Sequence, residues 1–559
     1  MVSNVAHTKR RYSLFVCSTL LALSVLYYIY WTGDLPDLID KKFSGNLQDT
    51  SNSSFSKAEE VKTIELPKPA FIIPSLSSSS SSSPSSSGAP TLPTEYSALA
   101  ESQQQCKLYF TPSYLEHIAT HQLPYCETQS LSAFHCFTAP RFVIPVTGNW
   151  GTTDPLCIAQ GVSFHPGQGS DEFDIQCNLR DLATERASSV EVAKELEGFR
   201  DRPTDWGWYW GDTGVGASLK TWHFEHRGDV TGCTQKTNNS GWVMLMRRDS
   251  SDPHNLWHKL MEILQARHSL DALRIAINPA TGKPWLSETD AANVQLVFDD
   301  DREELLQPLW DIVTSRKPIR KSSLQQPTCF GNVILPLPGC GSPFWSSLLD
   351  TGYSEHCPSQ TLLTTYVNRI FDFYGITPRT AKEINKHPKI TIVERKKNRK
   401  FISLDSWTAT LKERYPHSDI EVVDFAGITI EEQIRLAQST DILVGHHGAA
   451  MSHIIFMAAG ATAVEVLPQY FDQHGFRAIA AMRGVHYIAG RCMYEEEYET
   501  VVHDIPLPQD WPPLRPQEFD HWQQQEWTYM TDDEFLGLVD AAVRSQMNRI
   551  SSSDLQITL

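Results

Sequence analysis

The sequence predicts an α/β protein with two doubly wound halves, because short apolar runs alternate with stretches of helical periodicity along most of the chain. The alternation is most regular after Ile390, where strands and helices follow each other as they do in a parallel sheet. A serine-rich stretch and an apolar segment precede these halves, so the N-terminus is expected to lie outside the globular part. The apolar runs of the second half are Ile390–Val393, Ile420–Val423, Ile442–Val444, Ala463–Val466 and Val485–Ile488.

The N-terminal apolar segment is expected to be a transmembrane anchor. The uncharged residues 13–31 are just long enough to cross a bilayer as a helix, and the basic Lys9–Arg11 should keep residues 1–12 in the cytosol as a short tail. A cleaved signal peptide is the alternative, but the segment ends in Tyr27–Trp31 rather than in small residues. We therefore expect a single-pass type II membrane protein whose remaining residues face the lumen.

Residues 32–105 are expected to form a disordered stem, since serine, proline and small polar residues cannot bury enough apolar surface to order the chain. Of the eleven cysteines, Cys17 lies in the anchor, which leaves an even set where disulfides can form. Asn52 and Asn238 each begin an Asn-x-Ser sequence and are candidate N-glycosylation sites. The net charge of -18 argues against nucleic-acid binding, because phosphate backbones bind basic faces.

The globular part is expected to contain a first α/β domain over residues 106–375, a second over 376–514, and a C-terminal helix and tail over 515–559. The first domain is less regular than the second. Its predicted elements are strands at Trp242–Met246 and Val294–Phe298, a helix from about His254 to Gln265 and a helix near Leu305–Val313.

The segment Thr440–His453 is the most informative one, because an apolar strand runs into a turn of small residues that opens a helix. In open α/β sheets ligands bind beyond the carboxyl ends of strands, and the N–H groups at a helix start attract anions. A nucleotide diphosphate would fit such a turn. The alternative is that the small residues only allow tight packing and that the histidines are ordinary loop residues. The residues expected to contribute are His447, Gly448, Ala449, Ser452 and His453.

Charged residues flank this turn in the predicted sheet. Arg395 ends the first strand of the second half and could neutralise a diphosphate. Glu465 lies in an apolar run, where a carboxylate is costly unless it is paired or bound, and a ribose diol would be a suitable partner. A Glu465 that points outward is the alternative. The basic residues Lys396, Lys397, Arg399 and Lys400 are expected to be surface residues.

In the first half, His254, His258 and Glu262 recur every four residues and should share one helix face. Glu262 or His258 could accept a proton, and an ordinary exposed face is the alternative. A metal site is not indicated, because the glutamate that a zinc peptidase needs between its histidines is missing. Asp299–Asp301 is interpreted as a solvated helix start rather than as a metal site. The aromatic residues Trp206, Trp208, Tyr209 and Trp210 could stack on a sugar but are expected to be core.

Several of these segments resemble glycosyltransferase family 61, and more closely its branch of EGF-domain-specific O-linked N-acetylglucosamine transferases. Asn255–His258 with Glu262 resembles the family's Asn-x-x-His helix that ends in an acid. The resemblance extends from Cys106 to Met547. The motifs that carry it most clearly are Thr391–Arg395, Glu432–Ile434, Thr440–Ile442, His447–Ala449, His453 with Phe456, and Arg483–Ile488.

The resemblance implies a GT-B architecture, in which two Rossmann-like domains face a cleft, and an inverting transfer from a UDP-sugar to a hydroxyl of a protein or glycan. N-acetylglucosamine is the sugar that the branch implies. Arg395 and the turn would bind the phosphates, Glu465 would lie near the ribose, and Glu262 or His258 would deprotonate the acceptor. No cofactor is required by this scheme, although a divalent metal is possible. The chain departs from the pattern at Ala450, Met451, Ser452 and Glu262, which stand for glycine, leucine, threonine and aspartate.

Other functions remain open at this point. UDP-xylose is the main competing donor, and a catalytically inactive, membrane-tethered glycan-binding protein is the alternative from another class. A secreted hydrolase is disfavoured, because no Gly-x-Ser-x-Gly element is present. Since the chain ends in Asp554–Leu559 and not in a Lys/His-Asp-Glu-Leu signal, we expect the Golgi membrane rather than the endoplasmic reticulum.

Overall fold

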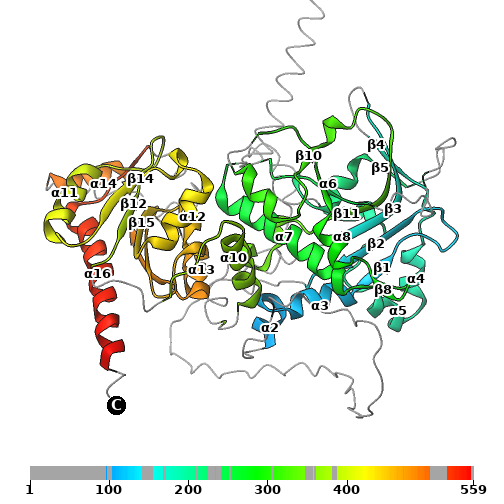
Figure 1. The fold of residues 1–559 in the computed structure, drawn as a ribbon, viewed down its shortest axis with the longest axis horizontal. Coiled ribbons are helices and arrows are strands. Elements are labelled where there is room, and N and C mark those ends of the chain that lie inside the picture. The colour runs from blue at the N-terminus through cyan, green and yellow to red at the C-terminus, as the bar shows by residue number, and fades with distance from the viewer. Residues whose placement is uncertain are drawn as a thin grey trace, which may run out of the picture. The chain divides into compact units, whose positions relative to one another are not determined.

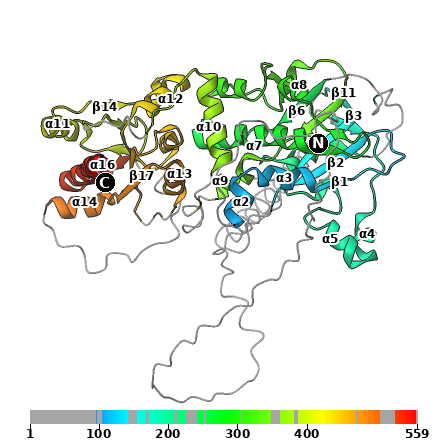
Figure 2. The same ribbon diagram turned by 60° about the horizontal axis from the view of Figure 1, so that its bottom comes forward.

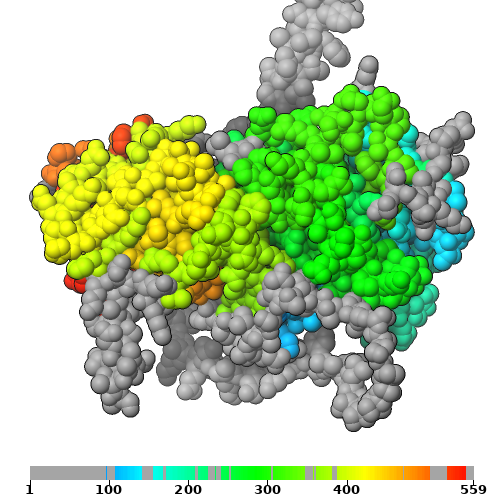
Figure 3. All heavy atoms as spheres, in the orientation of Figure 1, coloured from blue at the N-terminus to red at the C-terminus, as the bar shows by residue number. Residues whose placement is uncertain are grey.

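The computed structural model describes most of the chain from Gln104 onward, and all described residues belong to one compact unit, Ser85–Leu559 (Figure 1). Most of the predicted stem, the predicted tail and anchor, and Asn52 and Asn238 lie outside the described residues. Within the described part, no helix is both long and apolar enough to cross a bilayer. The described residues, coloured in Figure 3, are 96, 104–140, 155–167, 172–207, 212–224, 233, 241–250, 254–303, 306–346, 357, 360, 361–380, 387–469, 471, 473–503 and 526–555.

The first half is built on a nine-stranded mixed sheet. Its strand order is β1 (Gln122–Pro124), β2 (Ala133–Thr138), β3 (Pro155–His165), β11 (Thr328–Leu335), β6 (Trp242–Met246), β9 (Gln295–Phe298) and β10 (Ile319–Arg320), and β4 (Glu172–Ile175) and β5 (Trp222–His223) extend it beside β3. The strands β11, β6, β9 and β10 pair in parallel, whereas β1, β2, β3 and β11 pair antiparallel. The predicted strands β6 and β9 are therefore confirmed.

The expectation of a doubly wound first half holds only for the parallel part of this sheet. β1 and β2 are joined by the short segment 125–132, and a parallel crossover needs a dozen or more residues. The segment therefore forces antiparallel pairing. Disulfides fix the same region, because Cys136–Cys157 joins β2 to β3, and Cys126–Cys177 and Cys233–Cys329 join loops to it. Cys492 is a free, buried thiol.

The long helix α7 (Leu256–Ile275) packs beside the first sheet (Figure 1). The side chain of Asn255 caps it by accepting a hydrogen bond from Trp257 N, which explains why the helix begins where the Asn-x-x-His motif predicts. The predicted helix near Leu305–Val313 is a 3₁₀ helix, η5 (Gln307–Ile312), and not an α-helix. The other helices of this half are α2 (Gln104–Phe110), α3 (Ser113–Thr120), α4 (Leu182–Ser188), α5 (Val190–Glu195), α6 (Val215–Ser218), α8 (Glu288–Ala292), α9 (Pro343–Ser346) and α10 (Thr361–Phe373).

The second half is a five-stranded, fully parallel sheet with strand order β14-β12-β15-β16-β17. All five predicted strands are confirmed, since their apolar runs are fully buried in β12, β15 and β16 and lie at the edges in β14 and β17. If β12 is counted as the first strand, the order is 2-1-3-4-5, one of the two common doubly wound orders. The bounds are β12 (Ile390–Val393), β14 (Ile420–Val423), β15 (Ile442–His446), β16 (Thr462–Leu467) and β17 (His486–Arg491).

Helices cover this second sheet. Thr429 and Glu432 form the capping box predicted for α12 (Ile430–Ser439), and α11 (Leu404–Arg414), α13 (Gly475–Arg483) and α14 (Glu495–Val502) complete the connections. The predicted C-terminal helix is α16 (Asp532–Leu555), which lies against β16 and β17 (Figure 2). Its Phe535 stacks on Trp407 with ring centroids 4.2 Å apart. The C-terminal helix is therefore part of the core of the second half.

One hydrophobic cluster contains residues of both halves, among them Leu260 of α7 and Ile479 of α13. Within it, Trp257 packs edge-on against Phe476, with ring centroids 6.1 Å apart. This contact places the N-terminal turn of α7 against the second half of the molecule.

Candidate functional site

The strand order of the second sheet reverses between β12 and β15, and ligands of open α/β sheets bind at such a reversal, beyond the carboxyl ends of the strands. Arg395 follows the carboxyl end of β12. His446 ends β15, and the predicted turn follows it directly. Both sequence-predicted features therefore lie at the same edge of the sheet.

Two arginine side chains lie over Gly448 in this turn. A Cβ atom built on Gly448 would lie 2.8 Å from Arg399 Nη1 and 3.2 Å from Arg395 Nη1. Arg399 Nη1 donates to His447 O at 3.0 Å, and Arg395 Nη2 donates to Asn398 Oδ1 at 3.1 Å. Two guanidinium groups thus lie next to a stretch of backbone that carries no side chain. Guanidinium and backbone N–H groups are hydrogen-bond donors that suit a diphosphate.

Arg399 was expected to be a surface residue, and that expectation is wrong. Its backbone has φ = 57°, in the left-handed region that residues other than glycine rarely adopt, and this turns the chain so that the guanidinium reaches the turn after β15. The side chain of Lys396 is 63% exposed, as expected. A basic run does not reveal which of its members has an unusual backbone conformation.

The environment of the turn is electropositive. Burial lowers the pKa of His446 well below its ordinary value, and the charges of Arg399, His447 and Arg395 lower it further. The buried imidazole of His446 is therefore neutral, and its Nδ1 lies 3.0 Å from His447 O. Arg395 and Arg399 therefore contribute positive charge to this turn.

Replacing Gly448 by alanine is expected to weaken nucleotide binding. Gly448 has φ = 144°, which strains any other residue, and its new Cβ would press on both guanidinium groups. Displacing guanidinium groups that hydrogen-bond to a charged ligand costs about 1.5–3 kcal/mol, which corresponds to a roughly ten- to hundredfold loss in affinity, measured by titration with UDP. Gly282→Ala is the matched control, because Gly282 also has a positive φ but no atom within 4 Å of its new Cβ. Equal effects of both substitutions would contradict a role of the turn in binding.

The predicted helix after the turn is a 3₁₀ helix, η12 (Ala449–Phe456), and not an α-helix. Gly448, Ala449 and Ala450 are partly exposed, whereas Ser452 and His453 are buried. His453 Nδ1 lies 2.7 Å from Ala450 O and Nε2 lies 2.9 Å from Gln433 Oε1. Both ring nitrogens of His453 are thus used inside the protein, and this geometry supports packing rather than phosphate binding.

Glu465 of β16 is buried and holds His447. Its Oε1 lies 2.6 Å from His447 Nδ1, and its Oε2 accepts a hydrogen bond from the Tyr487 hydroxyl at 2.5 Å. The His447 ring also packs on Phe471, with centroids 4.4 Å apart. Since both carboxylate oxygens accept hydrogen bonds from the protein, this geometry gives Glu465 a positioning role toward His447, and its predicted ribose contact remains a prediction.

In the first half, Glu262 is almost fully buried and is bonded on both oxygens. Its Oε2 accepts from Lys259 Nζ at 2.5 Å and its Oε1 accepts from Asp249 N at 2.5 Å. Burial raises the pKa of Glu262, and the charge of Lys259 opposes this. Gly339 closes its remaining side, since a Cβ there would lie 2.8 Å from Glu262 N. These contacts make Glu262 a positioning residue.

His258, one turn earlier on α7, has the geometry of a proton acceptor. Its Nδ1 lies 2.8 Å from Asp249 Oδ2, and its side chain is 13% exposed. A carboxylate at Nδ1 fixes the tautomer that leaves the lone pair on Nε2. Glu262 holds the backbone of Asp249, and Asp249 in turn orients His258. The sequence analysis missed Asp249, although an acid three residues after the predicted strand Trp242–Met246 was the available signal.

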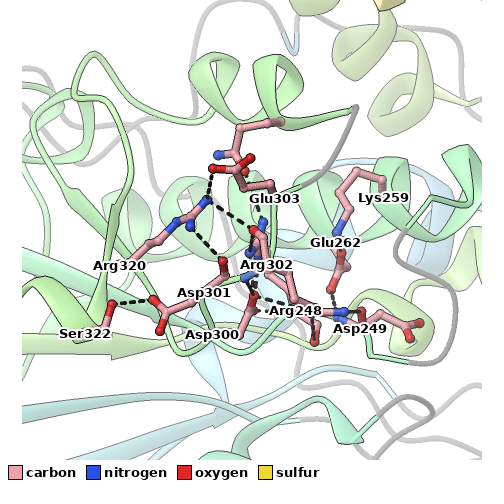
Figure 4. Close-up of polar contacts among 11 residues, drawn as sticks. Arg248, Asp249, Lys259, Glu262, Asp300, Asp301, Arg302, Glu303, Arg320 and Ser322 are labelled. Carbon is pink, nitrogen blue, oxygen red and sulfur yellow. Dashed lines mark hydrogen bonds and ion pairs between the residues drawn. The ribbon is translucent and has the colours of Figure 1, made fainter.

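A network of arginines and aspartates fixes the loop that carries Asp249 (Figure 4). Arg302 Nη1 donates to Asp249 O at 2.6 Å, and Arg248 donates to Asp300 Oδ1 at 2.5 Å. Asp301 accepts a hydrogen bond from the Ser322 hydroxyl. Asp299 accepts a hydrogen bond from Arg247 Nη1 at 3.0 Å, so all three aspartates after β9 are hydrogen-bonded within the protein, although they lie in the loop after β9 and not at the start of a helix as expected.

Replacing Asp300 by asparagine is expected to destabilise the fold by about 2 kcal/mol near pH 7, because the partly buried guanidinium groups lose their charged acceptor. Burial would raise the pKa of Asp300, but hydrogen bonds from Arg248 and Arg302 outweigh it and hold the pKa well below its ordinary value. The stabilisation is therefore fully present above the pKa of the unfolded state, about 4, and shrinks as the pH falls further. Urea denaturation of the parent and of Asp300→Asn at pH 7 and pH 3 measures the difference between their free energies of unfolding. A difference that is as large at pH 3 as at pH 7 would contradict the role given to Asp300.

The two remaining alternatives from the sequence concern metal and aromatic residues. The described residues contain no group of three His, Cys, Asp or Glu side chains that could hold a metal ion. His254 is exposed and lies before α7, and Glu262 is engaged by Lys259, so the metal interpretation of that helix face does not fit. Trp206 is a core residue at 5% exposure, and residues 208–210 lie outside the described part.

Comparison with known proteins agrees with the predicted resemblance. Residues 247–464 match the family model described as glycosyltransferase 61, a segment that includes Asp249, His258, both arginines and the turn. The EGF domain-specific O-linked N-acetylglucosamine transferase of Drosophila melanogaster is 26% identical over 160 residues, or 28% of this chain and 29% of that protein. The same-named protein of Gallus gallus is 31% identical over 138 residues, or 24% of this chain and 25% of that protein.

A plant protein matches a shorter segment. The beta-1,2-xylosyltransferase of Arabidopsis thaliana is 30% identical over 91 residues, which is 16% of this chain and 17% of that protein. In each of these matches the aligned segment spans less than a third of the relative's length.

Proposed function

Because residues 247–464 belong to glycosyltransferase family 61, we propose that this chain is a glycosyltransferase that moves a sugar from a UDP-sugar to a hydroxyl acceptor. The observation that carries the proposal is the convergence of Arg395 and Arg399 on Gly448, at the strand-order reversal of a parallel sheet. A nucleoside diphosphate is the ligand class that this charge, position and backbone suit best.

The donor binds with its diphosphate between the two guanidinium groups and the partly exposed backbone of residues 448–450. Ala449 contributes its backbone, and its small methyl group leaves room for the phosphates to approach. His447, held by Glu465, completes the wall of this site, and Glu465 is expected near the ribose. The side chains of Ser452 and His453 are buried, and they support the turn from the protein interior.

Transfer follows an inverting displacement. His258 Nε2 takes the proton from the acceptor hydroxyl, and the acceptor oxygen attacks the anomeric carbon of the sugar. The bond between that carbon and the β-phosphate oxygen breaks, and UDP leaves with the electron pair. Arg395 and Arg399 stabilise the negative charge that develops on the diphosphate. Metal ions are not needed in this scheme, because the guanidinium groups supply the positive charge.

The proposed setting is that of a Golgi enzyme with a single N-terminal membrane helix and a GT-B arrangement of its two halves. N-acetylglucosamine is the favoured sugar, since the relatives matched over 160 and 138 residues carry that transferase name. Xylose is the second candidate, supported by the match to the plant xylosyltransferase. An inactive glycan-binding protein is the third, and the contact between His258 and Asp249, which leaves Nε2 as a proton acceptor, argues against it.

A panel of UDP-sugars tests the proposal. The full chain is incubated with each donor, with and without a mixture of oligosaccharides and hydroxyl-bearing peptides, and UDP release is measured. We expect release with UDP-N-acetylglucosamine or UDP-xylose that rises when acceptor is added. If the chain neither binds, hydrolyses nor transfers from any donor, it is not a glycosyltransferase.

A further inference from the structure

A partly buried tryptophan lies directly beside the proposed proton acceptor. The rings of Trp345 and His258 have centroids 4.5 Å apart and planes inclined by 65°. Trp345 is packed on one side against the main hydrophobic cluster, yet it remains partly accessible. The neighbouring Phe344 is fully buried and packs on Phe110 at 5.3 Å. Phe344 therefore anchors α9 in the core, and Trp345 occupies the position next to the imidazole.

The position of Trp345 relative to His258 is fixed by backbone packing. The turn Gly339–Gly341, which precedes α9, packs directly on α7. Gly339 approaches so closely that a Cβ on it would lie 2.9 Å from Glu262 Cα. Since α7 also carries His258, the tryptophan and the proton acceptor belong to one rigid assembly and not to separate loops.

The position of Trp345 beside His258 restricts how an acceptor hydroxyl can reach the imidazole. Asp249 occupies His258 Nδ1, so an acceptor hydroxyl has to approach Nε2, at the edge of the same imidazole ring. A pyranose ring has an apolar face of C–H bonds that packs on the electron-rich face of an indole, while its hydroxyl groups project sideways. A sugar ring stacked on Trp345 would therefore carry its hydroxyl groups beside His258. A serine or threonine side chain is too small to cover an indole face.

We propose that Trp345 is the platform of an acceptor subsite for a sugar ring, so that the acceptor of this chain is a glycan hydroxyl. This inference rests on the proposed function and extends it to the class of acceptor. The indole orients the acceptor ring, and His258 removes the proton from the hydroxyl that the ring presents.

The first test compares acceptors. The full chain, with the donor that it uses best, is given a set of oligosaccharides and a matched set of hydroxyl-bearing peptides, including a folded disulfide-bonded domain. Transfer to oligosaccharides is expected, with little or none to peptides. If UDP-sugars are hydrolysed or bound but only peptides accept, the acceptor proposal fails while the transferase proposal stands. If no donor is used at all, the transferase proposal itself fails.

The second test uses substitutions of Trp345. Trp345→Ala is expected to raise the KM for the oligosaccharide roughly tenfold or more, with the donor KM and the rate of donor hydrolysis within about twofold of the parent. Trp345→Phe keeps an aromatic face and should recover most of the loss. Phe373→Ala, which removes a 49% exposed aromatic residue from the end of α10, is the matched control and should change nothing.

Saturation-transfer NMR gives an independent readout on the same proteins. The C–H protons of one face of the acceptor sugar should receive the strongest saturation from the parent chain and from Trp345→Phe, and this signal should disappear in Trp345→Ala. An unchanged acceptor KM in Trp345→Ala, or a parallel loss of donor affinity that indicates damaged folding in both Trp345 variants, would overturn the proposal.

Discussion

Replacing Arg395 by alanine is expected to weaken UDP binding by roughly 30- to 1,000-fold, because about 2–4 kcal/mol of charge-assisted hydrogen bonding to the diphosphate is lost. Arg395 Nη1 lies at the glycine of the turn, where the phosphates are proposed to bind. The measurement is a calorimetric titration of the full chain with UDP. Arg395→Lys should be intermediate, since a lysine keeps the charge but loses the planar pair of donors.

Lys396 provides the matched control for this prediction. It is the next residue in the same loop, its side chain is 63% exposed, and its nearest described carboxylates belong to Glu394 and Asp424. Lys396→Ala removes the same charge from the same loop and should leave UDP affinity within about twofold, because an exposed charge is screened by salt. Similar losses in both variants would show that general positive charge, and not the geometry at Gly448, attracts the nucleotide.

Replacing His258 by alanine is expected to lower kcat by roughly 10²–10⁴-fold with UDP affinity unchanged, because a positioned general base contributes about that factor. His258 lies in the first half, whereas the proposed diphosphate site lies in the second. The substitution should therefore change kcat without changing the Kd for UDP. Asp249→Asn should produce a smaller loss in kcat, since an amide at Nδ1 still contacts the ring but no longer fixes the productive tautomer.

His254 is the control for that substitution. It is exposed, precedes the same helix and was predicted to share its face, so His254→Ala should retain full activity. Activity that survives in His258→Ala but is lost in a folded Glu262→Gln protein would reverse the assignment of the two residues. We expect Glu262→Gln instead to lower the free energy of unfolding, because the substitution removes the carboxylate that pairs with the buried Lys259.

The second sheet could be predicted from sequence because each of its strands is a short apolar run flanked by helical periodicity. Local pattern alone determines such elements. The antiparallel part of the first sheet could not be predicted in this way. There, strands from 122 to 335 pair across long separations, and disulfides that are invisible in a single sequence fix them.

Some residues of the candidate site could be predicted from the sequence, and others could not. The common position of Arg395 and the turn after β15 could be predicted because both follow strand ends that are visible in the sequence, and their role in binding stays a prediction. Arg399 was not predicted at the turn because its position there depends on a left-handed backbone. Asp249 was not predicted because its contact with His258 joins the loop after β6 to a helix that begins seven residues later. His453 was expected at the phosphates, but Gln433 from α12 and Phe425 hold its ring in the interior.

Hydrogen–deuterium exchange with UDP tests the location of the donor site most directly. The full chain is compared with and without saturating UDP, and exchange is followed by mass spectrometry. We predict slower exchange in peptides that cover residues 394–401 and 446–453, with little change in the edge strands β1 and β2. UDP that binds without protecting either segment, or that protects only the first half, would contradict the diphosphate site at Gly448.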